Sequence, residues 1–312
     1  MSLYAELKER YGLDYILCVI CEPSGRNPDE DEPFRLVGGC PGKILPVVLA
    51  KGRLAHSCYV LNGLNSALIL AEIIRNVELS TDFLSIDCGV STQPPAAQVA
   101  RDLKDHYDVS LPEYSAAAFN MTFLCRTDPM DFFEKLKGVC RESLDAVLAR
   151  YNSVFEEMEN RGFVSADVRS NLKPTVMTVQ ELKNLVLNGK DGYGEFEENL
   201  SKRASLELAQ GKTMQEVSIA YIKQLVEFSG ITSPAVVIGI APPYYPAVSN
   251  HYLDTDIRPF LSRVEENLMT RHGLRVAGLP YSQGMTDMSY MSCVNPESVR
   301  QVMDNMGLPF GL

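Results

Sequence analysis

Pro234-Ala-Val-Val-Ile-Gly-Ile-Ala241 is the stretch of sequence that decides the fold class. The run is almost wholly apolar and is ended by Pro242-Pro-Tyr-Tyr-Pro246, so it predicts a strand that is buried on both faces. A second such run, Tyr15-Ile-Leu-Cys-Val-Ile-Cys21, precedes Glu22-Pro23. Strands of this kind are typical of parallel sheets covered by helices. We therefore predict an α/β protein in which both runs belong to one parallel-sheet domain.

The sequence between these two runs alternates strand and helix patterns. Strand patterns occupy 36–54 and 115–125, with edge strands expected around 83–88, and helix patterns occupy 62–78 and 127–159. This order predicts a ferredoxin-like α+β domain, residues 36–165, inserted into a first domain made of 1–35 and 231–312.

A helical insertion is predicted between this inserted domain and the second buried run. Helix patterns occupy 179–187, 196–210 and 214–229. The first begins with the capping box Thr178-x-x-Glu181 and the last with Thr213-x-x-Glu216. We assign residues 166–230 to this insertion.

Composition excludes several classes of protein. The chain has 312 residues, of which 46% are hydrophobic, so we expect two packed units with real cores. A net charge of −11 argues against a protein that coats nucleic acid or an anionic membrane. No apolar run approaches the roughly 20 residues of a membrane span, and the N-terminus has no secretion signal. With eight irregularly spaced cysteines, expected to be reduced and mostly buried, these features predict a cytoplasmic protein with small-molecule or peptide-like partners.

Several residues are candidates for chemistry. Glu22 follows a buried strand, where open α/β sheets place ligands, and its carboxylate can hold a metal or simply be solvated. His56 follows a strand pattern, where it can donate a hydrogen bond to an oxyanion or lie on a surface loop. Asp287 ends the glycine turn Gly284-Met-Thr-Asp287, which suits binding. Cys18 and Cys21 would point to opposite faces of a strand, so we predict that they are core residues.

In their order along the chain, these elements resemble the metallopeptidase family of aminoacylases, glutamate carboxypeptidase G and succinyl-diaminopimelate desuccinylase. Glu22-Pro23 is similar to the family's Glu-Pro element, and Ala55-His56 and Asn62-Gly-Leu-Asn65 to the start of its lid domain. Ala241-Pro-Pro-Tyr-Tyr-Pro246 and Gly284-Met-Thr-Asp-Met-Ser-Tyr290 resemble the arginine-utilisation branch of RocB-type proteins.

The resemblance implies hydrolysis of an amide bond by a metal-bound water in a site with two zinc ions. It identifies residues 36–165 as the lid, through which two copies would form a homodimer. Residue by residue, Glu22 would be a zinc ligand and His56 the oxyanion-stabilising residue of the lid. Asp287 and Asn120 would bind a substrate that is a small amino acid, acyl-amino acid or peptide-like compound.

The sequence also departs from the family's pattern. The family's His-x-Asp segment, bridging Asp and Glu pair precede the Glu-Pro strand, where this chain has about 20 residues, and its last His ligand would follow residue 312. A catalytic zinc site needs three protein ligands, and one carboxylate matches. We therefore expect weak zinc binding or none, and no hydrolysis by this chain alone. It is either part of a complete enzyme or a non-catalytic dimerisation or ligand-binding relative.

Overall fold

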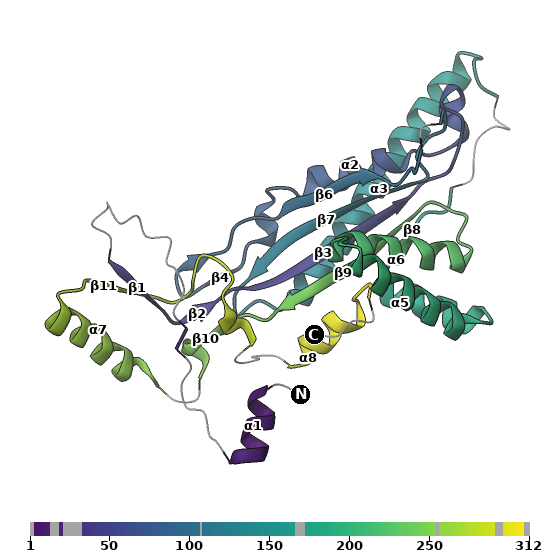
Figure 1. Cartoon of the computed structure of the whole chain (residues 1–312). Coiled ribbons are helices and arrows are strands. Elements are labelled where there is room, and N and C mark those ends of the chain that lie inside the picture. The colour runs from purple at the N-terminus through teal and green to yellow at the C-terminus, as the bar shows by residue number, and fades with distance from the viewer. Residues whose placement is uncertain are drawn as a thin grey trace.

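A computed structural model describes residues 3–12, 19–20, 33–106, 108–165, 172–253, 256–290 and 296–308. Its centre is a five-stranded mixed sheet in the order β6-β7-β3-β9-β8, with helices on both faces (Figure 1). The strands are β3 (Gly42–Lys51), β6 (Ala96–Asp102), β7 (Tyr114–Phe123), β8 (Thr175–Thr178) and β9 (Ala235–Tyr245). The predicted α/β class is confirmed.

The order of elements around this sheet is ferredoxin-like. Strand β3 is followed by α2 (Ser66–Val77), then by β6, β7 and α3 (Pro129–Asn160), and finally by β9. Strands β6, β7, β3 and β9 pair antiparallel, whereas β8 pairs parallel to β9. Strand β9 is the fourth strand of the ferredoxin-like motif, and in the sequence it follows β8 and the helical insertion.

This pairing corrects two predictions. The strand predicted at 234–241 was placed in a domain with Tyr15–Cys21, yet β9 lies beside β3, with Ala235 opposite Lys51 and Tyr245 opposite Lys43. A strand buried by helices on both faces is continuously apolar whether its neighbours are parallel or antiparallel. Of Tyr15–Cys21, only residues 19 and 20 are among those described.

The edge strand was also predicted at the wrong place. The sheet's edges are β6 and β8, and at 83–88 the structure has only part of the short hairpin of β4 (Ile86–Asp87) and β5 (Val90–Ser91). Most of β6 is exposed, so its sequence lacks the apolar run from which we identify strands.

Helices cover the two faces of the sheet and create two cores. Helices α2 and α3 pack on one face, where Ile44 and Val48 of β3 meet Phe119 and Leu136. The insertion covers the other face with α4 (Val179–Gly189), α5 (Tyr193–Ala209) and α6 (Met214–Ser229). Both predicted capping boxes are present, at Thr178 and Thr213.

Two short strand pairs lie at the Gly42 end of β3 and beyond it (Figure 1). Strand β2 (Gly39–Cys40) pairs with β10 (Val248–Ser249), and β1 (Phe34–Val37) pairs parallel to β11 (Val276–Leu279). Helix α7 (Arg258–His272) contacts β11, and α1 (Leu3–Tyr11) is the first described helix. Helix α8 (Pro296–Asp304) instead packs against α3, and Met306 after it bridges to Ile240 of β9 (Figure 1). Within the described ranges, no helix has both the length and the apolarity needed to cross a membrane.

Candidate functional site

His56 lies at the entrance to the 3-10 helix η1 (Ser57–Asn62), beyond the Lys51 end of β3, and its side chain is exposed. Its Nδ1 accepts a hydrogen bond from the backbone N–H of Cys58 at 3.1 Å. The neutral ring must therefore carry its proton on Nε2. A donor N–H is thus held outward at one end of the sheet.

Backbone hydrogen bonds fix the loop that carries His56. Arg53 and Leu64 exchange two N–H to carbonyl bonds of 2.8 and 3.0 Å, and the N–H of Ser57 donates to the carbonyl of Val109 at 2.8 Å. Strand β3 is anchored just before this loop, because the buried Lys51 pairs with Glu113 at 2.5 Å.

Large hydrophobic side chains are exposed around this loop. Four large hydrophobic side chains on the loop and its neighbouring segment are at least half exposed: Leu54, Tyr59, Val60 and Val109. We call these four residues the loop patch. Exposed apolar side chains of this kind can serve as a contact surface where they lie together.

The two branch-specific motifs meet at the opposite end of β3, around Cys40. The Cys40 thiol accepts a hydrogen bond from the backbone N–H of Thr286 at 3.1 Å and lies 3.3 Å from the Ser289 hydroxyl. Cys40 is also opposite Val248 in the β2–β10 pair, directly after the 241–246 motif. Asp287 begins the 3-10 helix η5 (Asp287–Tyr290) in this segment and is exposed.

A small cavity of about 130 Å³ adjoins this end of the sheet. Tyr244 and Pro246 of the first motif line it, together with Cys125 and Arg126 at the end of β7. The 241–246 motif therefore contributes to a pocket, as well as ending a strand.

The three predicted site residues that the structure describes, His56, Asn120 and Asp287, do not come together within one chain. Ten residues of β3 separate the His56 end from the Asp287 end, which is about 30 Å at the usual rise of a strand. Asn120 is partly buried in β7, opposite Ala96. Because side chains alternate between the two faces along β7, Asn120 and Ala118 point to the same face, which α4–α6 cover. Glu22 lies outside the described residues, so its role stays a prediction.

The described residues do not fit a zinc centre. Nowhere in the part of the chain that the structure describes do three His, Cys, Asp or Glu side chains gather as metal ligands would. The cysteines in this part, Cys40, Cys58, Cys88, Cys125 and Cys140, are free thiols, as predicted, but only Cys40 and Cys140 are buried.

A cluster that we did not predict is centred on Asp87, a carboxylate with 4% exposure. The Tyr252 hydroxyl, at the end of the 3-10 helix η4 (Asn250–Tyr252), donates to it at 2.7 Å, and the Tyr281 hydroxyl at 2.6 Å. Arg126 pairs with Asp87 at 3.5 Å and donates to the Tyr252 hydroxyl at 3.0 Å. This Asp87 cluster joins the β4–β5 hairpin and the end of β7 to the segment that follows β9.

The electrostatics of the Asp87 cluster favour anchoring over proton transfer. Burial acts to raise the pKa of Asp87, but hydrogen bonds from Tyr281, Tyr252 and Cys88 together outweigh it, and the pKa lies below its usual range. Burial and the hydrogen bond to Asp87 raise the pKa of Tyr252 to about 12, and burial raises that of Cys125 to about 11. At neutral pH the carboxylate is therefore ionised and its partners keep their protons.

Nothing in the spacing of the sequence pointed to this cluster. Its members come from four separate segments, and each residue type is common in loops. Only the burial of a carboxylate between two tyrosines distinguishes it, and that requires the fold.

Comparison with known proteins gives distant likenesses. No family model matches the chain. The chain is 24% identical over 306 residues to the uncharacterized protein YqjN of Bacillus subtilis (strain 168). The aligned region covers 97% of this chain and 54% of that protein. The chain is 25% identical over 253 residues to protein RocB of the same organism. This alignment covers 80% of this chain and 42% of RocB. The chain thus spans about half the length of the curated relatives it matches.

Two solved structures are similar at a lower level. A tripeptidase from Staphylococcus aureus subsp. aureus Mu50 has a TM-score of 0.41 at 10% identity, over 84% of this chain and 44% of that one. Aminopeptidase PepT from Bacillus cereus ATCC 10987 has a TM-score of 0.39 at 10% identity, over 84% and 43%. Scores below 0.5 do not establish a shared fold.

Proposed function

We propose that this chain is the lid-bearing part of a peptidase- or amidohydrolase-type enzyme, which cleaves an amide bond in a small amino-acid, acyl-amino-acid or peptide-like compound. The observation that carries the proposal is His56, whose Nε2–H is held outward by the bond to Cys58 at the end of a ferredoxin-like domain. The likeness to RocB over 253 residues supports an arginine-related branch.

In this proposal His56 acts as a hydrogen-bond donor. As an amide carbonyl becomes tetrahedral, negative charge develops on its oxygen, and a fixed N–H aimed at that position stabilises the transition state. The cap bond at Nδ1 leaves no other tautomer of the neutral ring. None of the described residues has a role in the zinc chemistry that the resemblance implies.

The reading frame is the first test of this function. A frame that continues upstream into a His-x-Asp and Glu-Glu segment supports the enzyme, and a start at Met1 supports the non-catalytic dimerisation or ligand-binding alternative. In the protein made from the whole frame, we expect His56→Ala to lower amide hydrolysis by about 10²–10³-fold, the usual cost of losing one oxyanion donor. Release of amino groups from N-acyl amino acids and short peptides measures this.

A matched variant separates chemistry from folding in that test. His251→Ala removes another histidine, one that lies beyond β10, and should leave hydrolysis unchanged. Full activity in His56→Ala, with an unaltered thermal melt, would contradict the role of His56 without excluding another catalytic arrangement.

We further propose that two copies pair through the lid, so that His56 of one subunit faces the Glu22 side of the other. The distance of about 30 Å between the His56 end and the Asp287 end of β3 supports a composite site. The exposed edge strand β6 and the loop patch offer surfaces for contact. Light scattering at micromolar concentration should give twice the 34.6 kDa of one chain.

Point variants test which surface makes this contact. Tyr59→Asp places a charge in the loop patch and should shift the particle toward the monomer. Leu206→Asp, at an equally exposed leucine of α5, should not. A wild-type chain that stays monomeric across the concentration range would exclude the pairing.

A further inference from the structure

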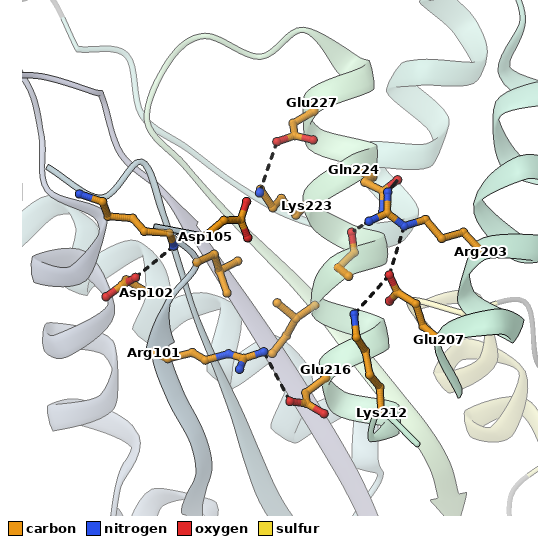
Figure 2. A pocket seen from close by; sticks show the side chains of 14 residues that line it. Arg101, Asp102, Asp105, Arg203, Glu207, Lys212, Glu216, Lys223, Gln224 and Glu227 are labelled. Carbon is orange, nitrogen blue, oxygen red and sulfur yellow. Dashed lines mark hydrogen bonds and ion pairs between the residues drawn. The ribbon is translucent and has the colours of Figure 1, made fainter. Parts of the chain in front are cut away.

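A cavity of about 580 Å³ lies between the end of edge strand β6 and the α5–α6 pair (Figure 2). Its lining includes the apolar side chains of Leu103, Ile219 and Ala220, and charged side chains surround them. Lys104, which also lines it, donates to the Ser110 carbonyl at 2.9 Å, so the cavity borders the segment that supports the His56 loop. None of the residues assigned to the proposed hydrolytic site lines this cavity.

On the helical wall of the cavity, two cations share one carboxylate. Glu207 is 8% exposed, and it pairs with two cations: Arg203 Nε at 3.1 Å and Lys212 Nζ at 3.4 Å. Arg203 also donates to the Gln224 side chain at 3.2 Å. One carboxylate balances only one of the two cations, and a guanidinium has five N–H donors. Donors therefore remain on this wall for an anionic group.

On the strand wall, two acids have no cation partner among the described residues. Asp102 accepts a hydrogen bond from the backbone N–H of Lys104 at 3.0 Å, which leaves its second oxygen available. Asp105 is exposed, and within the described residues its carboxylate has no hydrogen-bond or ion-pair partner. Figure 2 shows both acids on the side of the cavity opposite Arg203 and Lys212.

The other charges around the cavity neutralise one another. Arg101 pairs with Glu216 at 3.6 Å, Lys223 pairs with Glu227 at 3.8 Å, and Lys104 pairs with Asp108. The net electrostatic character is therefore a dipole across the cavity, with the anionic wall at β6 and the cationic wall at α5–α6. A ligand that carried only one charge would be attracted by one wall and repelled by the other.

We propose that this cavity binds a small dipolar molecule of the chemical class of short zwitterionic peptides. The carboxylate of such a molecule would meet Arg203 and Lys212, its ammonium group would meet Asp102 and Asp105, and its aliphatic part would cover Leu103 and Ile219. This inference stands independently of the hydrolytic function proposed above, because it uses none of that site's residues.

Calorimetric titration of the whole chain with trialanine at low ionic strength tests the proposal. We expect saturable binding of one peptide per chain. N-acetyl-trialanine lacks the ammonium group and trialanine amide lacks the carboxylate, so each should bind at least tenfold more weakly. Equal binding of the three peptides, or no saturable binding of trialanine, would overturn the assignment.

Variants that each remove one charge test which wall binds the ammonium group and which binds the carboxylate of the peptide. Asp105→Asn should weaken trialanine binding without affecting the acetylated peptide, and Arg203→Gln should weaken trialanine binding without affecting the amide. Lys212→Gln repeats the second test if Arg203→Gln fails to fold. Glu198→Gln is the matched control, because Glu198 lies on α5 outside the cavity and pairs with Lys202. The same loss of binding in this control as in Asp105→Asn would also refute the proposal.

Discussion

Asp87→Ala should lower the free energy of unfolding by about 2–5 kcal/mol. The substitution removes the acceptor of two tyrosine hydroxyls in a site that admits little water. Each buried hydroxyl left without an acceptor costs about 1–3 kcal/mol. Tyr281 is 5% exposed and donates to Asp87 at 2.6 Å, so it has no easy solvent partner. Urea unfolding followed by circular dichroism measures the change.

Two further variants give this experiment its controls. Asp82→Ala removes an exposed carboxylate five residues away and should change stability by no more than about 0.5 kcal/mol. Tyr281→Phe removes one donor and leaves the carboxylate, so it should cost less than Asp87→Ala. If Asp87→Ala were no more destabilising than Asp82→Ala, the Asp87 cluster would not be an anchor.

The same cluster predicts how stability depends on pH. Because the pKa of Asp87 is lower in the folded chain than in the unfolded chain, its contribution is complete above the unfolded value of about 3.9 and is lost as pH falls through the folded value. The stability difference between wild type and Asp87→Asn should therefore be constant near neutrality and shrink below about pH 4. A difference that grew on acidification would have the wrong sign.

The features that the sequence predicted well are local ones. The capping boxes at Thr178 and Thr213 depend on residues three apart, and the long helix α3 begins at Asp128-Pro129, whose side chain and ring define a helix start. The position of His56 beyond a strand also followed from local pattern. Such contacts form within one or two turns and leave a periodic signature.

The features that could not be predicted from the sequence depend on contacts between distant segments. Strand β9 could be recognised as buried, but its neighbour β3 is about 190 positions away, and no pattern in 234–241 specifies the partner. Asp87 and Tyr281 are likewise 194 positions apart. For the candidate site, His56 and Asp287 could be named from the sequence, whereas their separation along β3 required the register of the sheet.

Gly52→Ala should be the most damaging small substitution near His56. A Cβ at Gly52 would lie 2.1 Å from the Leu64 carbonyl oxygen and 2.8 Å from the Ser66 nitrogen, both backbone atoms. The Gly52 N–H donates to the Glu113 carbonyl at 2.7 Å, so the strand cannot move away without losing that bond. Overpacking of this kind costs about 1–3 kcal/mol, and relief of the clash must open the Arg53–Leu64 pair that holds the His56 loop.

The comparison that isolates this effect is Gly138→Ala in α3, where the added methyl meets no atom within 4 Å. There the change should stabilise the helix by about 0.5–1 kcal/mol, because alanine restricts the unfolded chain more than glycine does.

Urea unfolding measures the free energy of both variants, and hydrogen exchange of the amides at 53–64 reports how well the His56 loop is held. We expect Gly52→Ala to lower the unfolding midpoint and accelerate exchange in that segment, while Gly138→Ala leaves the exchange there unchanged. A Gly52→Ala chain with wild-type stability and wild-type exchange would mean that the His56 loop is not held by this close approach of two backbones.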